Sequence, residues 1–81
     1  MEFEIDFRSQ TPSYRQLADK IRAAIAAGEY GPDDPLPSLR TLQQETGLAM
    51  ATVQHAMAVL RDEGLIVAVS GRGTFVAQQP D

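Results

Sequence analysis

Residues 47–64 constrain the fold more than any other stretch, because they begin and end with glycine and hold an apolar stripe at helical spacing. The stripe consists of Val53, Ala56, Met57 and Leu60, at positions i, i+3, i+4 and i+7. This spacing predicts one amphipathic helix over residues 49–63. The opposite face carries few charges and consists of Met50, Ala51, Gln54, His55 and Arg61. We expect this second face to contact whatever the protein binds.

The residues before this helix predict a shorter helix and a sharp turn. Ser38 is a good cap for a helix from Leu39 to about Glu45, and Gly47 permits the turn that follows. A short helix, a turn with glycine and a longer helix form a helix-turn-helix pattern. Ordinary helical hairpins have the same spacing, so this pattern alone leaves both DNA binding and a purely structural role open.

A further helix is expected over residues 12–27. Pro12 suits the first turn with Thr11 as its cap, and Gly28 suits the left-handed position that ends a helix. The apolar stripe of this helix consists of Tyr14, Leu17, Ala18, Ile21 and Ile25. The width of the stripe predicts that this is the central helix of the core.

The residues after the glycine at position 64 have the pattern of a β-hairpin. Residues 65–69 are mostly branched and apolar, residues 70–73 form a glycine-rich turn, and residues 74–77 form a second short strand. A hairpin directly after a helix-turn-helix makes a winged helix. We therefore predict an α+β fold, a winged helix-turn-helix of three helices and a C-terminal two-stranded β-hairpin wing.

The N-terminal segment differs from the rest in its period-two alternation. Phe3, Ile5 and Phe7 fall on one side and polar residues on the other, which is typical of a half-buried strand or an extended arm. We divide the chain into an extended arm over 1–11, a winged domain over 12–77 and a C-terminal tail over 78–81.

Composition narrows the class of function. The 81 residues form one small domain, and the absence of cysteine, with His55 the single histidine, excludes a thiolate metal site and a structural zinc finger. No nucleophile with a base, carboxylate pair or phosphate-binding loop is present, so neither an enzyme nor a cofactor is expected. No apolar run reaches the roughly 18 residues of a membrane span, and the acidic start is unlike a signal peptide. We expect a cytoplasmic protein without membrane contact.

The net charge of −4 argues against an unaided nucleic-acid binder, since such domains are usually basic. The acidic excess lies in the two terminal segments, however, because the formal charge is zero without Glu2, Glu4, Asp6 and Asp81. Within residues 35–80, three arginines balance three acidic residues. The expected binding half is therefore neutral and lacks a strong electrostatic footprint.

Five short motifs, in order and at matching spacing, resemble the DNA-binding domain of the GntR family of bacterial transcription regulators. They lie at residues 12–18, 25–30, 36–40, 60–65 and 71–76. The resemblance implies a winged helix-turn-helix that binds double-stranded DNA, with a repressor acting as a homodimer on an inverted-repeat operator. Family members usually continue into a larger effector-binding domain, which is not contained in this chain. Truncation and a complete small protein both fit.

The resemblance also implies which residues touch DNA. Arg40 matches an arginine that reaches the major groove and binds guanine or phosphate, although a solvated arginine paired with an acid is the structural alternative. Thr52 matches a position on phosphate or base edges, although its hydroxyl can instead bond back to the helix. Gly71 and Arg72 match the wing tip on a phosphate or the minor groove. Ser38 combines a cap with a phosphate contact, and capping alone also explains it.

Three positions at the start of helix 49–63 depart from the family pattern, and so do residues 67–69 of the wing, where polar or basic residues are common. Ala49 stands where a polar cap is usual, Met50 where a polar or basic residue is common, and Gln54 where arginine is common. Gln54 can still bind adenine, and Met50 or Ala51 can lie against a thymine methyl group. The predicted site uses helix 49–63 in the major groove and the 70–73 wing on the adjacent groove or backbone. Its residues are Ser38, Arg40, Met50, Ala51, Thr52, Gln54, Gly71 and Arg72.

The same departures support a rival interpretation. If exposed, Met50, Val67 and Val69 form an apolar surface that is more typical of a protein interface than of a DNA groove. The domain is then a protein-interaction module, an adaptor or antagonist of another regulator, with weak or no DNA binding. His55 fits a phosphate contact and an inert surface position equally well.

Overall fold

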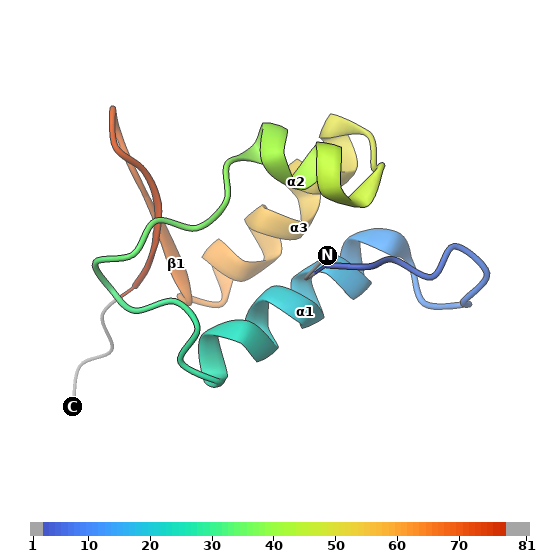
Figure 1. The fold of residues 1–81 in the computed structure, drawn as a ribbon, viewed down its shortest axis with the longest axis horizontal. Helices are drawn as coiled ribbons and strands as arrows, with labels where there is room; N and C mark the ends of the chain where they lie inside the picture. The colour runs from blue at the N-terminus through green and yellow to red at the C-terminus, as the bar shows by residue number, and fades with distance from the viewer. Residues whose placement is uncertain (1–2, 78–81) are drawn as a thin grey trace.

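The computed structural model describes residues 3–77 as three helices followed by a two-stranded antiparallel hairpin (Figure 1). The elements are α1 (Ser13–Ala26), α2 (Leu39–Thr46), α3 (Met50–Asp62), β1 (Ile66–Val69) and β2 (Gly73–Val76). The predicted winged helix-turn-helix is therefore confirmed. The tail expected over 78–81 and the first two residues of the expected arm lie outside the described residues.

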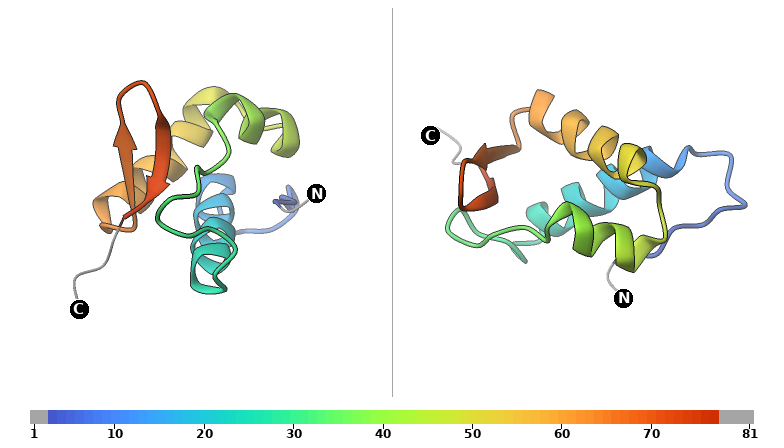
Figure 2. Two further views of the ribbon diagram at one scale, coloured as in Figure 1. Left: turned by 60° about the vertical axis from the view of Figure 1, so that its left-hand side comes forward. Right: turned by 90° about the horizontal axis from the view of Figure 1, so that it is seen from above.

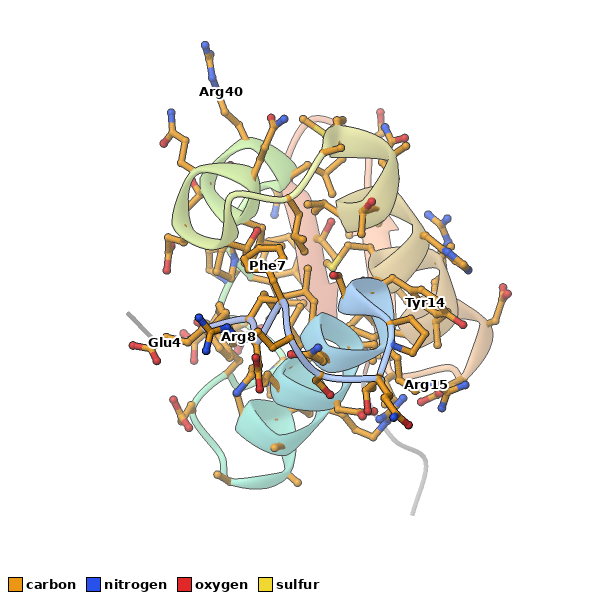
Figure 3. The ribbon with its side chains drawn as sticks, turned by 90° about the vertical axis from the view of Figure 1, so that its right-hand side faces the viewer. Glu4, Phe7, Arg8, Tyr14, Arg15 and Arg40 are labelled. Atoms are coloured by element: carbon orange, nitrogen blue, oxygen red, sulfur yellow. The ribbon has the colours of Figure 1, made fainter. Side chains whose placement is uncertain are left out.

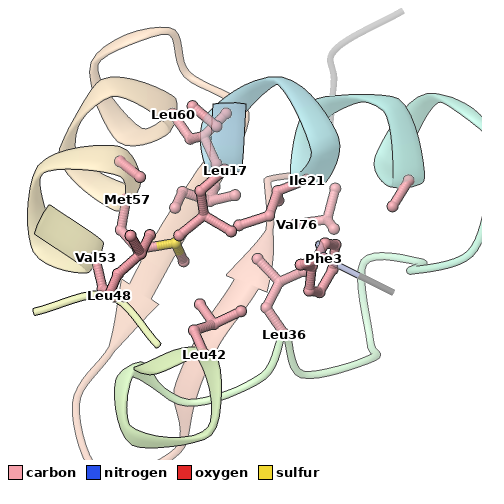
Figure 4. Close-up of a cluster of buried hydrophobic side chains, with 14 residues drawn as sticks. Phe3, Leu17, Ile21, Leu36, Leu42, Leu48, Val53, Met57, Leu60 and Val76 are labelled. Atoms are coloured by element: carbon pink, nitrogen blue, oxygen red, sulfur yellow. The ribbon is translucent and has the colours of Figure 1, made fainter. Parts of the chain in front are cut away.

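The core lies where α1 and α3 pack against each other and α2 closes one side (Figure 4). The stripe of α3 turns inward as its spacing predicted, and α1 contributes Leu17 and Ile21 while α2 contributes Leu42. Burial of a large aliphatic side chain stabilises a fold by roughly 1.5–3 kcal/mol. The buried apolar residues are Phe3, Leu17, Ala18, Ile21, Ala24, Leu36, Leu42, Leu48, Val53, Ala56, Met57, Leu60, Ile66 and Val76.

The start of α1 differs from the prediction. Pro12 occupies the cap position, and no side chain caps the helix there. Thr11 therefore lies one residue too early to reach the free N–H groups of the first turn, and the expected Thr11 cap is wrong. The Thr11 carbonyl instead accepts a hydrogen bond from the side-chain amide of Gln16 (2.9 Å).

The N-terminal segment keeps its expected alternation only in part. Phe3 is 2% exposed and belongs to the core, and Ile5 packs partly against it, but Phe7 is 66% exposed. The alternation ends because Asp6 begins a turn, in which its side chain accepts from the Arg8 N–H (2.9 Å) and its carbonyl from the Ser9 N–H (3.2 Å). Residues 3–6 form neither a helix nor a strand of the described chain.

The hairpin is tied to the loop that precedes α2, which runs beside it (Figure 2). The Leu36 N–H donates to the Thr74 carbonyl (2.8 Å), and Pro35 forms an isolated bridge with Phe75. These contacts fix the wing relative to the start of α2, so that the parts of the predicted site belong to one framework.

Candidate nucleic-acid interface

The start of α2 is sealed by its own cap. The Ser38 hydroxyl accepts from the Thr41 N–H (3.1 Å) and donates to the Thr41 hydroxyl (3.0 Å), so the expected cap is present. Arg40 is exposed and projects away from the body of the domain (Figure 3). Arg40 forms no ion pair with any residue between 3 and 77. The alternative, an arginine paired with an acid, is therefore not observed within these residues.

The turn between α2 and α3 is held by Thr46, a residue that the sequence interpretation did not single out. Its buried hydroxyl donates to the Leu42 carbonyl (2.6 Å) and accepts from the Leu48 N–H (3.2 Å). Gly47 has the left-handed φ of 75° that the turn requires. Leu48 is buried beyond it, so the turn is anchored on both sides. This anchoring fixes the angle at which α3 leaves α2.

The start of α3 lacks a side-chain cap, as Ala49 implied. Ala49 has the same extended backbone as Ser38, with φ −64° and ψ 151° against −67° and 163°, but it offers no acceptor. The N–H groups of Met50 and Ala51 donate to no residue of the described chain. Because the first N–H groups of a helix have no intrahelical acceptor, they remain available to an external one.

The outward face of α3 carries most of the predicted readers. Ala51 and Gln54 are exposed, whereas Met50 and Thr52 are half-buried. The Thr52 hydroxyl forms no hydrogen bond within residues 3–77, so it is not bonded back to the helix. Gln54 also borders a shallow groove of about 610 Å³ between α3 and the inner face of the wing. Other residues of that groove include Arg61, Ala68 and Thr74.

His55 has a role that the sequence did not reveal. Its ring stacks on the ring of Tyr14 in α1, with centroids 3.8 Å apart and planes inclined by 15°. Tyr14 belongs to the apolar stripe of α1 and packs half-buried at the edge of the core. The stack joins the first half of α3 to the first turn of α1. The residues around Tyr14 and around His55 in the sequence do not predict this long-range contact.

The wing presents a tight turn at its tip. Gly71 has a φ of 77°, and the Arg72 N–H donates to the Val69 carbonyl (3.0 Å). The Arg72 side chain is exposed and forms no ion pair among the described residues. The two residues predicted at the wing tip therefore lie together on a surface turn.

One of the two acids at the end of α3, Glu63, is held by a residue of α1. Glu63 forms an ion pair with Arg22 of α1 (2.7 Å), and Arg22 also pairs with Asp19 (2.6 Å). The hydrogen bonds that Arg22 donates to Glu63, and then to Asp19, raise the pKa of its guanidinium. Arg40 of α2 and Arg72 of the wing are thus free of ion pairs within residues 3–77, as are other exposed arginines, while Arg22 is paired with two acids at the side of α1.

The apolar surface proposed by the rival interpretation is divided in the structure. Val67 is 44% and Val69 38% exposed, and both line a hollow on the outer face of the wing with Pro32 and Phe75. Met50 is half-buried and does not line that hollow. The three side chains therefore do not form one continuous patch.

Residues 3–77 contain neither a membrane-spanning helix nor a cluster of metal ligands. None of the helices there combines the length and apolar character needed to cross a membrane. No three His, Asp or Glu side chains in that range gather to hold a metal ion.

The family model described as "Bacterial regulatory proteins, gntR family" matches residues 13–76. The chain belongs to the GntR family. It is 41% identical over 68 residues to the mannosyl-D-glycerate transport/metabolism system repressor MngR of Escherichia coli, covering 84% of this chain and 28% of MngR. The GntR chain thus spans less than a third of that relative.

Two solved structures of DNA-binding proteins are similar to this chain. YtrA from Sulfolobus acidocaldarius, a GntR-family transcription factor, superposes with a TM-score of 0.89 at 44% identity, covering 99% of this chain and 84% of that one. The DNA-binding domain of AraR in complex with operator ORX1 superposes with a TM-score of 0.85 at 32% identity, covering 95% and 99%. The chain is therefore a winged-helix DNA-binding domain of GntR-type transcription regulators.

Proposed function

We propose that this domain binds an operator in double-stranded DNA and represses transcription in the bacterial cytoplasm. The observation that carries the proposal is the exposed face of α3, poor in charge and flanked by two arginines, Arg40 and Arg72, that are free of ion pairs within residues 3–77. An α-helix fits the major groove of B-DNA, where base edges can be distinguished. MngR is a named repressor and the AraR domain is a named operator complex, which supports the same role here.

The readers divide by chemistry. Gln54 is suited to a bidentate contact with adenine, and Arg40 to guanine or a phosphate. Met50 and Ala51 are suited to thymine methyl groups, because both are small or flexible apolar side chains. Thr52 has a free hydroxyl for a phosphate or a base edge. The proposed operator therefore has A·T pairs under α3.

The backbone contacts supply position rather than sequence. The free N–H groups of Met50 and Ala51 are suited to a phosphate oxygen, since a helix N-terminus favours negative charge. Ser38 adds a hydroxyl at the start of α2, and Gly71 with Arg72 reaches the backbone or the minor groove from the wing. Amides and hydroxyls carry no charge, so they anchor DNA without releasing counterions.

This distribution predicts a weak dependence on salt. Each neutralised phosphate contributes about −0.9 to the slope of log K against log salt concentration. If only Arg40 and Arg72 neutralise phosphates, the slope is about −2 for one copy and about −4 for two. Such limited anchoring favours a homodimer on an inverted repeat, since the second copy then binds at a high effective concentration.

The test is selection of bound sites from random duplex DNA, followed by affinity measurements on the selected site at several salt concentrations. We expect an inverted repeat with A·T pairs in each half-site. Arg40→Ala is expected to weaken binding by about 1–3 kcal/mol, and Gln54→Ala to relax preference at one base pair by a similar amount. Lys20→Ala is the matched control, because it removes an exposed positive charge from α1. Failure to select any sequence, together with a stable complex with another protein, would contradict DNA readout.

A further inference from the structure

The turn that follows the N-terminal segment is built and held, although it lies on the surface. The side-chain amide of Gln16 in α1 accepts from the Asp6 N–H (2.8 Å) and donates to the carbonyls of Asp6 and Thr11 (both 2.9 Å). Within the turn, the Thr11 N–H donates to the Ser9 hydroxyl (3.0 Å). One glutamine thus clamps both ends of residues 6–11 to the helix.

This clamped turn presents Phe7 to solvent. The Phe7 side chain is 66% exposed, the largest exposure among the large apolar side chains noted between residues 3 and 77. A solvent-exposed aromatic ring does not contribute the hydrophobic free energy that its burial would give. The turn is also held in place, so it does not gain conformational entropy that would offset this loss. Exposed aromatic residues that are held in place are typical anchors of protein interfaces.

The position of the turn indicates which partner fits. The wing and the Phe7 turn lie at opposite ends of the long axis of the domain (Figure 1). Under the proposed function, the wing end contacts the flanking DNA backbone, so a second copy on an inverted repeat approaches the other end. Arg40, on the proposed DNA side, projects upward in the view along that axis (Figure 3).

We propose that the face around Phe7 is the contact between two copies of this domain bound to the two halves of one operator. This inference rests on the proposed function for the arrangement of the copies. The two-fold axis passes in front of Phe7 and runs toward the side on which Arg40 projects. Two Phe7 rings then meet across the axis, as an isologous interface requires.

The charges of this face complement each other under the same axis. Figure 3 shows Glu4 and Arg8 on one side of Phe7 and Arg15 on the other. A two-fold rotation exchanges the two sides, and it brings Glu4 of one copy opposite Arg15 of the second copy. Glu4, Arg8 and Arg15 are exposed and form no ion pair within residues 3–77. Their charges are therefore available to a second copy.

The first test compares binding of the whole chain to a single half-site and to the full inverted repeat. Phe7→Ser is expected to leave half-site affinity unchanged and to lower the cooperativity of binding to the repeat by about tenfold. Val67→Ser is the matched control, because it removes an exposed apolar side chain at the wing end and is expected to keep the cooperativity. Full cooperativity in Phe7→Ser, or its loss in Val67→Ser, overturns the proposal.

Charge reversal tests the pairing itself. Glu4→Arg and Arg15→Glu are each expected to reduce cooperativity, because each creates two like-charge contacts across the axis. The double variant, and an equimolar mixture of the two single variants, are expected to regain it. Absence of recovery contradicts the arrangement. The new arginine of Glu4→Arg can bind a DNA phosphate by itself. Half-site affinity is therefore measured for every variant, so that this effect is separated from cooperativity.

Sedimentation equilibrium of the free protein separates this contact from DNA readout. Weak self-association that is lost in Phe7→Ser supports the interface even if no operator is selected, whereas absence of half-site binding contradicts only the proposed function. Self-association that is unchanged in Phe7→Ser overturns the interface.

Discussion

The starts of α2 and α3 share a backbone geometry and differ in their side chains. Both cap residues are extended, with φ and ψ that agree to within about 12°. Ser38 closes the start of α2 through Thr41, whereas Ala49 leaves the start of α3 without a side-chain acceptor. The start of α2 is thus capped by a side chain, whereas the start of the helix proposed to enter DNA is held by backbone hydrogen bonds alone.

The difference shows that a cap that stabilises the helix is present at the start of α2 and missing at the start of α3, the end proposed to bind DNA. A polar cap satisfies one N–H group and stabilises a helix by about 1 kcal/mol. In α3 the equivalent N–H, that of Thr52, donates to the Ala49 carbonyl instead (3.0 Å), and the N–H groups that remain available to a phosphate are those of Met50 and Ala51. The missing side-chain acceptor therefore weakens α3 slightly, while the first two N–H groups of the helix stay available to the ligand.

The largest expected effect comes from the turn that joins the two helices. Thr46→Val removes the hydroxyl that binds Leu42 and Leu48 and leaves the Leu48 N–H buried without its partner. We expect a loss of about 2 kcal/mol in the free energy of unfolding, measured by urea denaturation. Thr11→Val is the control, since the Thr11 hydroxyl forms no hydrogen bond within residues 3–77. Equal denaturation midpoints for both variants would exclude this role of Thr46.

The next effect removes the seal of α2. Ser38→Ala is expected to lower the free energy of unfolding by about 1 kcal/mol, because the Thr41 N–H loses its acceptor. Thermal unfolding followed by circular dichroism measures it. A change below a few tenths of a kcal/mol would mean that the solvent replaces this cap without loss.

The smallest effect adds a seal to α3. Ala49→Ser is expected to raise the free energy of unfolding by about 0.5 kcal/mol, since the backbone of residue 49 already has the conformation of a cap. The same thermal experiment measures it against Ser38→Ala. If Ala49→Ser destabilises the protein, residue 49 cannot act as a cap in the way that Ser38 does. The comparison between the starts of α2 and α3 is then wrong.

Local patterns predicted most of the fold, because the stripes of α1 and α3 report burial directly. The caps of α2 and α3 were also predictable, since each depends on neighbours within four residues. The Thr11 cap was wrong because one residue of register at Pro12 decides it. The exposure of Phe7 depends on the turn that Gln16 holds from ten residues away, which the alternation of residues 3–7 does not encode.

The sequence predicted which positions belong to the candidate site, but it did not predict which of their side chains are exposed and free of other partners. The family motifs supplied Arg40, Thr52 and Arg72, while their freedom from other partners emerged only from the folded chain. The stack of His55 on Tyr14 joins residues 41 positions apart, and no spacing rule links them. The bond from Leu36 to Thr74, which fixes the wing against α2, is equally remote in sequence.

The most direct measurement of the central claim is a titration of the labelled protein with a selected half-site, followed through the amide chemical shifts. The account predicts the largest saturable shifts at Met50, Ala51 and Gln54, with further shifts at the wing tip and none at Val67 on the outer face. A duplex of unrelated sequence is the control and should give smaller shifts at α3. Largest shifts at Val67, or unchanged amides at Met50 and Ala51, would contradict the claim that the open start of α3 faces DNA.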